Sequence, residues 1–188
     1  MLKDYSQDVT VTIRPSKASD VESITEIYAF HVLNGLATFE TTPPGQAEMA
    51  ERRADALSKG FPYLVAEMGV GANARVVGYA YANLYRARPA YRHTLEDSIY
   101  LLKDMGGRGI GTKLLRALIE ACEKLGTRQL VAIIGDSANE GSIKVHANCG
   151  FAHTGTLKDV GFKFGRWVDT VMMQLAIGEG GTSLPTQK

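Results

Sequence analysis

Residues 94–113 read TLEDSIYLLKDMGGRGIGTK and hold, in order, a strand pattern, a glycine-rich segment and the start of a helix. The strand is predicted over 94–102 and the glycine-rich segment over 105–111. Apolar residues then recur at helical spacing, at Ile110, Leu114, Leu115, Leu118, Ile119 and Cys122, and predict a helix that Gly126 ends. A strand that turns through glycines into an amphipathic helix is typical of an α/β domain.

The glycine-rich segment could bind an anion. Successive glycines let several backbone N–H groups point at one spot, and the helix N-terminus adds the positive end of its dipole, so a phosphate or pyrophosphate fits there. A glycine turn that only packs the helix against the strand is an equal alternative on this segment alone. Two familiar phosphate loops do not fit. Thr112-Lys113 reverses the order that a P-loop needs, and Thr112 replaces the last glycine of a dinucleotide fingerprint.

The remaining apolar patterns predict the element order βααβββαβαββ. Upstream, strands are predicted over 9–14, 63–68 and 75–84, and helices over 19–34 and 46–58. Downstream, a strand is predicted over 129–134, a helix over 139–148, a strand from Gly150-Phe151 and a last strand over 168–177. The order predicts one α/β domain over 9–177 with a mixed sheet flanked by helices. Residues 1–8 form an N-terminal extension, and 178–188 a polar tail that we expect to be disordered.

Composition excludes several classes of partner. The 188 residues are 45% hydrophobic, which suits one domain, and 21 basic against 20 acidic residues give no basic excess for nucleic acid. Cys122 and Cys149 lack C-x-x-C spacing, and no histidine pair has metal-ligand spacing, so no metal is expected. The N-terminus lacks the apolar segment of a secretory signal and no run reaches membrane-span length, so a cytoplasmic protein away from the membrane is expected.

Several ordered motifs carry a family resemblance. The glycine-rich segment resembles Arg/Gln-x-x-Gly-x-Gly/Ala, the acetyl-CoA pyrophosphate motif of the GCN5-related N-acetyltransferase (GNAT) superfamily, with Gly106 at the first position. Five more motifs, spread over about 11–175, are similar to those of phosphinothricin and methionine sulfoximine N-acetyltransferases. They are Ala37-Thr38-Phe39-Glu40 before Pro43-Pro44, Glu96-Asp97-Ser98-Ile99-Tyr100, Asn139-x-x-Ser142-x-x-x-His146, Gly150-Phe151 and Val160 to Trp167.

The resemblance implies a GNAT fold, that is, a mixed and mostly antiparallel sheet with helices on both faces. It also implies acetyl-CoA as co-substrate, a homodimer, and acetylation of the α-amine of glutamate-like compounds that carry a tetrahedral phosphinyl or sulfoximine group, a detoxifying reaction. Gly106 removes the usual Arg or Gln side chain but keeps the backbone amides, so weaker CoA binding is expected rather than a lost site.

Acetyl transfer to an amine needs a base, because an ammonium group is not a nucleophile. Glu96 is the candidate base, since it lies on the strand that leads to the glycines and the resemblance places the family's catalytic glutamate there. A solvent-facing strand carboxylate is the plain alternative. Asp97 points to the opposite face by strand alternation and is interpreted as structural. No tyrosine lies between Asn139 and Phe151, so His146 or solvent is expected to protonate the departing thiolate.

The cofactor site is expected to combine backbone and side-chain groups. Backbone amides near Tyr100 and Leu101 would polarise the thioester carbonyl and contact the pantetheine. Asn139 resembles the family's CoA-contacting asparagine and could equally cap a helix, two roles that can coexist. The full candidate cofactor set is Ile99, Tyr100, Leu101, Gly107, Arg108, Gly109, Ile110, Gly111, Thr112 and Asn139.

The substrate site is expected around an arginine cluster that precedes the base. Guanidinium groups match carboxylate and phosphinate oxygens in pairs, and the alternative is a basic solvated loop. The cluster consists of Arg86, Arg88, Tyr91 and Arg92, with Arg92 ranked first as a substrate ligand. By resemblance, Phe39 and Glu40 form a lid over the substrate, and Lys163 and Phe164 lie near the active site and the dimer contact.

The leading hypothesis is an acetyl-CoA-dependent N-acetyltransferase for a small anionic amino-acid-like compound: phosphinothricin, methionine sulfoximine or sulfone, or an arsenic analogue. An acetyltransferase for a protein N-terminus or an aminoglycoside is a second hypothesis. Arginines beside the base would repel a polycation, and a lid at Pro43-Pro44 suits a closed site better than a peptide groove. A non-catalytic CoA-binding module is the third hypothesis, and Glu96 argues against it.

Overall fold

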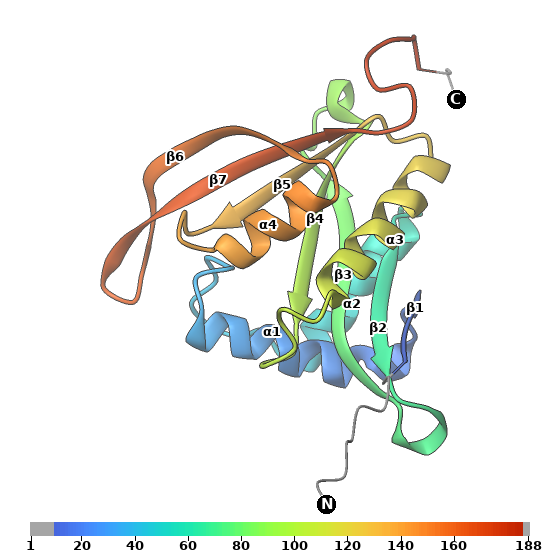
Figure 1. Ribbon diagram of the computed structural model, residues 1–188, viewed down its shortest axis with the longest axis vertical. Coiled ribbons are helices and arrows are strands. Elements are labelled where there is room, and N and C mark those ends of the chain that lie inside the picture. Colours follow the sequence, from blue (N-terminus) through green and yellow to red (C-terminus); the bar gives the residue numbers. More distant parts are fainter. Residues whose placement is uncertain (1–9, 186–188) are drawn as a thin grey trace, which may run out of the picture.

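Seven strands form one sheet in the computed structural model, which describes residues 10–185; their order across the sheet is β1-β2-β3-β4-β5-β7-β6 (Figure 1). The strands are β1 (Val11–Pro15), β2 (Tyr63–Met68), β3 (Arg75–Leu84), β4 (Thr94–Leu101), β5 (Gln129–Gly135), β6 (Ala152–Lys163) and β7 (Arg166–Ala176). The helices are α1 (Val21–Asn34), α2 (Gln46–Ser58), α3 (Ile110–Lys124) and α4 (Glu140–Asn148). Only β4 and β5 pair in parallel, so the sheet is mixed and mostly antiparallel as expected.

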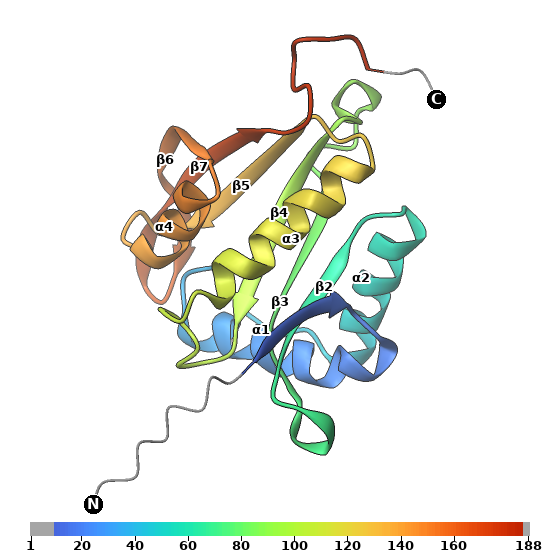
Figure 2. The same ribbon diagram turned by 45° about the vertical axis from the view of Figure 1, so that its right-hand side comes forward.

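The helices cover both faces of the sheet. Helices α1 and α2 lie on one face, where Ile24, Ile27 and Val32 pack against Val65 and Tyr79 (Figures 1 and 2). Helices α3 and α4 lie on the other face. The α3 stripe predicted from the sequence is buried there: Leu114, Leu115, Leu118 and Cys122 lie in one cluster with side chains of β3, β4 and β5. Burial of each such leucine contributes about 1.5–3 kcal/mol to folding.

Strands β4 and β5 stay together over only part of their length. Their register runs from Thr94 opposite Gln129 to Asp97 opposite Ala132. Beyond Asp97, β4 continues to Leu101 beside β3, while β5 continues beside β7. The strand edges that face each other past Asp97 therefore have no strand partner, and the gap between them opens the site described below.

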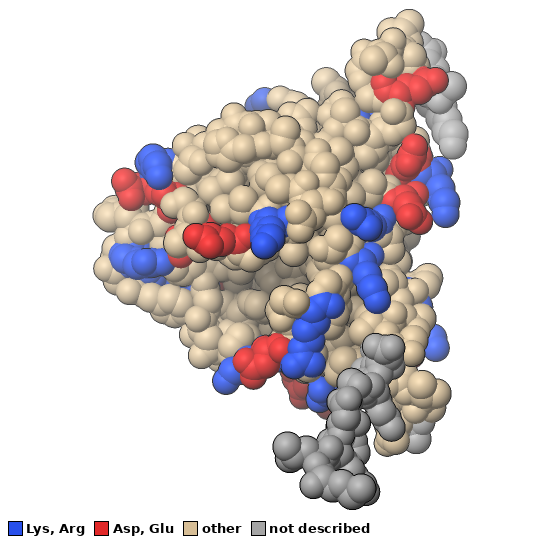
Figure 3. Space-filling model, in the orientation of Figure 1, with Lys and Arg blue, Asp and Glu red and all other residues tan. Residues whose placement is uncertain are grey.

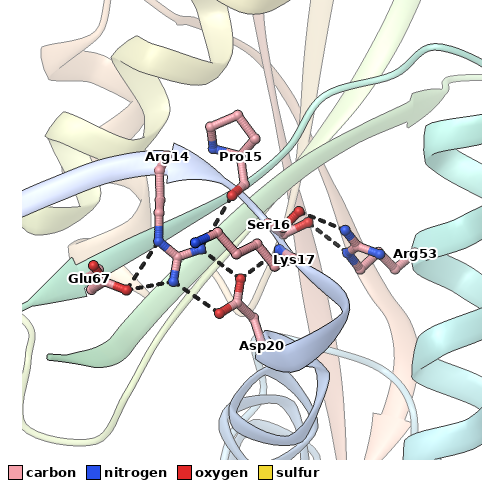
Figure 4. Close-up of polar contacts among 7 residues, drawn as sticks. All are labelled: Arg14, Pro15, Ser16, Lys17, Asp20, Arg53 and Glu67. Atoms are coloured by element: carbon pink, nitrogen blue, oxygen red, sulfur yellow. Dashed lines mark hydrogen bonds and ion pairs between the residues drawn. The ribbon is translucent and has the colours of Figure 1, made fainter. Parts of the chain in front are cut away.

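A polar network fixes the start of the sheet (Figure 4). The Arg14 guanidinium on β1 donates to both carboxylate oxygens of the buried Asp20, at 2.7 and 3.0 Å, and also to Glu67 on β2. From α2, Arg53 donates to the hydroxyl and carbonyl of Ser16, at 2.7 and 2.6 Å. These bonds tie β1 to its neighbouring strand and to both helices of one layer.

The element order matches the sequence prediction throughout the described residues. The second helix and the next two strands have the predicted bounds. The extension 1–8 lies outside the described residues. After β7, residues 178–181 form turns, and Arg128 donates to Ser183 at 3.1 Å; the disorder of the tail stays a prediction. No helix in residues 10–185 is both long and apolar enough to cross a membrane.

Candidate active site

A cleft of about 840 Å³ opens where β4 and β5 separate. Its walls come from the ends of the two strands, from the glycine-rich segment with the start of α3, from α4, and from the β6–β7 turn. The segment after α1 closes one side. The strand residues in the walls are Asp97, Ser98, Ile99, Tyr100, Leu101, Ala132, Ile133, Ile134 and Gly135.

The glycine-rich segment forms the turn that the sequence predicts. Gly107 and Gly109 both have φ of +74°, a left-handed conformation that glycine adopts without strain. Gly109 is the N-cap of α3, so the first N–H groups of the helix point out beside it. Gly111 is buried against α4, because an added Cβ would lie 3.3 Å from the Val145 side chain. In Figure 3, basic side chains gather over this segment and α3, which suits an anionic ligand.

The segment that follows α1 is fastened to the far half of the sheet. Gly135 at the end of β5 touches its backbone so closely that a Cβ would lie 2.1 Å from the Leu36 carbonyl oxygen. Lys163 on β6 is buried and donates to the carbonyls of Gly35 and Thr38, at 2.8 Å each. Lys163 was predicted to lie near the active site, at the substrate, and its ammonium group binds these two carbonyls.

The two predicted lid residues are also anchored. The Phe39 ring lies on the backbone of Gly161, where a Cβ would come within 1.9 Å of a ring carbon. Glu40 accepts from the Tyr28 hydroxyl at 3.0 Å and from Arg52 on α2 at 2.6 Å. The pair therefore forms a fixed wall beside the cleft. Phe164, with φ of +50° and an exposed ring, lines the cleft from the β6–β7 turn.

Glu96 and Asp97 point to opposite faces of β4, as strand alternation predicts. Glu96 is half-buried on the face of α1 and α2, directly opposite Asn83 of β3. Burial and the nearby charge of Asp97 raise the pKa of Glu96, and the positive charge of Arg86 partly opposes them. A carboxyl group with a raised pKa is a stronger base once ionised, which suits proton abstraction from an ammonium.

The arginine cluster does not converge on one point. Arg86 lies over the Tyr85 ring, at 4.6 Å from its centroid, and its charge acts on Glu96. Arg92, ranked first from the sequence, turns back to the carbonyl of Pro89 at 3.4 Å. Arg88 and Tyr91 are exposed. Arg86 is thus the arginine of this cluster whose charge lowers the pKa of Glu96.

His146 and Asp97 form a buried pair on the face of α3 and α4. His146 Nε2 lies 3.0 Å from Asp97 Oδ2, and Nδ1 lies 2.8 Å from the Ser142 carbonyl oxygen. Burial alone would lower the pKa of His146, but the Asp97 carboxylate and the Ser142 carbonyl raise it above its ordinary value. Both nitrogens face oxygen acceptors, and this arrangement stabilises the charged imidazolium relative to the neutral ring.

Most of the predicted cofactor residues lie together in the cleft wall. Asn139 both lines the cleft and caps α4, because its side chain accepts from the Ser142 N–H at 3.2 Å. Two predicted members do not line it: Ile110 is buried in the core, and Arg108 is exposed on the turn. The predicted residues that do line it are Ile99, Tyr100, Leu101, Gly107, Gly109, Gly111 and Thr112. Over the described part of the chain, no His, Cys, Asp and Glu side chains gather as a metal site requires.

Sequence reasoning missed several cleft residues. His31 on α1 lines the cleft, and its Nε2 donates to the Leu101 carbonyl at 2.8 Å. Nothing in the helix pattern distinguishes this histidine from a packing residue. The sequence did contain a signal for Gly135, because a glycine at the end of an apolar strand often marks a place where another backbone comes close. The apolar residues Ala132 to Ile134 of β5 fit a buried strand, and nothing in their pattern indicates that they also line the cleft.

Comparisons with known proteins agree with this geometry. Residues 13–172 match the acetyltransferase (GNAT) domain family. A phosphinothricin N-acetyltransferase of Alcaligenes faecalis is 51% identical, with 93% of this chain and 86% of that protein covered. An L-methionine sulfoximine/L-methionine sulfone acetyltransferase of Pseudomonas paraeruginosa is 38% identical, with 89% and 95% covered. The crystal structure of a GNAT superfamily phosphinothricin acetyltransferase from Sinorhizobium meliloti in complex with acetyl-CoA has a TM-score of 0.89 and 48% identity, with 95% and 94% covered.

These matches extend over nearly the whole chain and agree with the family resemblance of the sequence motifs. The family match spans residues 13–172, and the A. faecalis protein is 51% identical over 93% of this chain. The chain therefore belongs to the acetyltransferase (GNAT) domain family.

Proposed function

We propose that this protein transfers the acetyl group of acetyl-CoA to the α-amine of a small amino-acid-like compound of the phosphinothricin or methionine sulfoximine and sulfone kind. One observation carries the proposal: the gap between β4 and β5 begins directly after Asp97, so Glu96 lies one residue before the point where the strands part. The names of the similar proteins support the substrate class.

Acetyl-CoA fits the cleft from the glycine turn inward. The amides at Gly107, Gly109 and Gly111 would hold the pyrophosphate at the positive end of α3. The pantetheine would then run between the strands along Ile99 to Leu101, whose edge toward β5 has no strand partner. That edge offers backbone N–H groups to the thioester oxygen, where they would stabilise the charge that develops during attack.

Glu96 takes the proton of the substrate ammonium, and the free amine attacks the thioester carbon. The N–C bond forms and the C–S bond breaks, which releases coenzyme A as a thiolate, and the nitrogen loses its second proton to solvent as it becomes the neutral amide. His146 in its imidazolium form, or solvent, returns a proton to the sulfur. Because both ring nitrogens of His146 are engaged, one of its two hydrogen bonds must open for that transfer.

The α-carboxylate of the substrate would meet Arg86, whose charge already reaches Glu96. Phe39 and Glu40 would form the adjoining wall, with Arg88, Tyr91 and Arg92 at the rim. Lys163 acts on the substrate only indirectly, by holding the segment from Gly35 to Thr38 in place.

A second copy of this chain is the proposed partner. The β6–β7 hairpin exposes three large aromatic side chains, Phe162, Phe164 and Trp167, each more than half exposed. Figure 1 shows that this hairpin extends from the edge of the sheet. Pairing two such surfaces in a homodimer would bury aromatic area that a monomer leaves in water.

The test is a panel of acceptors with release of free CoA as the readout. Phosphinothricin, methionine sulfoximine and methionine sulfone are compared with an aminoglycoside and with a peptide that carries a free N-terminus. We expect acetyl-CoA-dependent turnover with the amino-acid analogues. Turnover confined to the aminoglycoside or the peptide would replace the proposed substrate class, and binding of acetyl-CoA without turnover of any amine would favour the non-catalytic alternative.

A further inference from the structure

The end of β4 is held from the cleft by a histidine of α1. His31, in the last turn of that helix, lines the cleft, and its Nε2 lies 2.8 Å from the Leu101 carbonyl oxygen. A carbonyl oxygen can only accept a hydrogen bond, so Nε2 carries the hydrogen. Figures 1 and 2 both show β4 ending beside α1. The contact joins this helix to the strand edge along which the pantetheine is proposed to run.

Strand register decides which backbone groups of β4 face the gap. In an antiparallel pair, the N–H and C=O groups of alternate residues point to the partner strand. The Leu102 N–H donates to the Val77 carbonyl of β3 at 2.8 Å, and the pairing of β3 with β4 runs without a shift up to Leu101. Leu102 therefore faces β3, whereas Leu101 and, two residues earlier, Ile99 direct their N–H and C=O groups into the gap.

The peptide between Leu101 and Leu102 is fixed from both sides. Strand β3 binds its N–H, and His31 binds its carbonyl. Past Asp97, β5 no longer pairs with β4, so His31 supplies the donor that a neighbouring strand would otherwise supply. The Leu101 N–H is attached to the same Cα as this carbonyl. A fixed carbonyl therefore also restricts the direction in which that N–H points into the gap.

The surroundings of His31 keep its ring in place and neutral. The half-buried ring lies between Phe30 and Tyr100, with ring centroids 5.6 and 5.4 Å away. Burial lowers the pKa of His31; the Leu101 carbonyl opposes this effect, and the Lys163 ammonium adds to the lowering. A neutral imidazole has one N–H, and the bond to Leu101 uses it.

The residues that follow His31 contact the other edge of the gap. The Leu36 carbonyl lies against Gly135 at the end of β5, and Lys163 of β6 holds the carbonyls of Gly35 and Thr38. The end of α1 and the segment after it thus connect the separated ends of β4 and β5. His31 makes the β4 contact of this connection.

We propose that His31 is a positioning residue for the pantetheine arm of acetyl-CoA, and that its Nε2–H fixes the Leu101 peptide whose N–H binds that arm. The inference rests on the proposed function for the course of the pantetheine along β4. It predicts that changes at His31 weaken contacts to the pantetheine and spare the nucleotide half of coenzyme A, which the glycine turn would hold.

The experiment measures dissociation constants by calorimetry for acetyl-CoA and for 3′-phospho-ADP, the nucleotide half that lacks the pantetheine. His31→Leu removes the donor. His31→Gln places an amide N–H near the position of Nε2, and His31→Asn offers the same amide on a side chain too short to reach. Because a neutral hydrogen bond is worth about a two- to tenfold factor, the Kd for acetyl-CoA should rise by that factor in the Leu and Asn variants.

Rescue by the longer amide and the second ligand separate positioning from a general structural role. In His31→Gln the Kd for acetyl-CoA should stay within about twofold of the wild type, and the Kd for 3′-phospho-ADP should stay so in all three variants. With an active amine, the KM for acetyl-CoA should follow its Kd while the KM for the amine does not change.

Unchanged binding of acetyl-CoA in His31→Leu, or an equal rise of Kd for both ligands, would overturn the inference. If His31→Leu does not fold, the two amide variants decide it, and equal Kd values for acetyl-CoA in His31→Gln and His31→Asn would overturn it as well. Failure of every amine to release CoA would instead count against the proposed function, and the binding comparison would still decide the role of His31.

Discussion

Glu96 and Asp97 are neighbours on β4, and their carboxylates lie on opposite faces of the sheet. Glu96 faces α1 and α2, and Asp97 faces α4, where its Oδ2 lies 3.0 Å from His146 Nε2. This alternation follows from the sequence, and it was predicted. The His146 contact was not, because it joins residues 49 positions apart and depends on how α4 packs on the sheet.

Arg86 should tune the candidate base. Its positive charge lowers the pKa of Glu96 against the raising effects of burial and Asp97, so Arg86→Ala should raise that pKa further. Glu96 would then ionise at higher pH, and the acidic limb of the kcat/KM profile should move to higher pH. Loss of a guanidinium that grips the substrate carboxylate should also cost roughly 1.5–3 kcal/mol in kcat/KM. Arg92→Ala is the matched control, and a limb that moves equally in both variants would contradict the assignment.

Gly109 is the glycine whose conformation matters most for the proposed phosphate site. Its φ of +74° disfavours any L-residue, and Gly109→Val should cost about 1–2 kcal/mol in stability. A side chain there would also hinder close backbone approach, so the KM for acetyl-CoA should rise. The control is Gly45→Val at the N-cap of α2, where φ is −75° and the space is open. Unchanged acetyl-CoA kinetics in a folded Gly109→Val protein would remove the phosphate assignment.

At the scale of elements, the wall beside the cleft is built by contacts between distant segments. The segment after α1 was predicted as a proline-containing loop with a lid role. Its contacts with the end of β5 and with β6 were not predicted. Gly135, Gly161 and Lys163 hold it, and each lies roughly a hundred or more residues away. A buried lysine on a strand resembles an exposed one in sequence, so only the fold reveals that its partners are carbonyl groups.

Gly135→Ala tests whether this wall matters. The new Cβ would lie 2.1 Å from the Leu36 carbonyl oxygen, so the segment must shift. Overpacking of this kind typically costs about 1–3 kcal/mol, which denaturant unfolding would measure, and kcat/KM should fall because the cleft wall moves. Gly155→Ala on β6 adds the same methyl group in open space. Equal stability and activity in the two variants would show that the contact is dispensable.

At the scale of the whole molecule, the sequence predicted the element order but only part of the architecture. Periodicity gave helices and strands with bounds close to those observed, because each element's apolar face is local information. It could not give the insertion of β7 between β5 and β6, or the point at which β4 and β5 part. Both depend on pairing between distant strands; the family resemblance supplied the mixed, mostly antiparallel sheet with helices on both faces, but not these two features.

The exposed hairpin aromatics predict the assembly state. Trp167 is 63% exposed and packs edge-on against Phe162, at 5.2 Å between ring centroids. If a second copy covers this surface, sedimentation should give twice the chain mass of 20.4 kDa. Trp167→Glu should then give a monomer, because a buried carboxylate without a partner opposes association. Leu184→Glu, at an exposed residue after β7, is the control. A wild-type monomer at micromolar concentration would contradict the homodimer.

Glu96 is the proposed general base of the acetyl transfer, and measuring kcat of Glu96→Gln across about pH 6 to 10 tests that role. The amide keeps the shape but not the basicity, so kcat should fall about 10²–10⁴-fold near neutral pH while both substrates still bind. The deficit should shrink as pH rises toward the pKa of the substrate amine, because more of the amine then arrives already deprotonated. A near-normal kcat at neutral pH, or a loss that does not change with pH, would contradict the account.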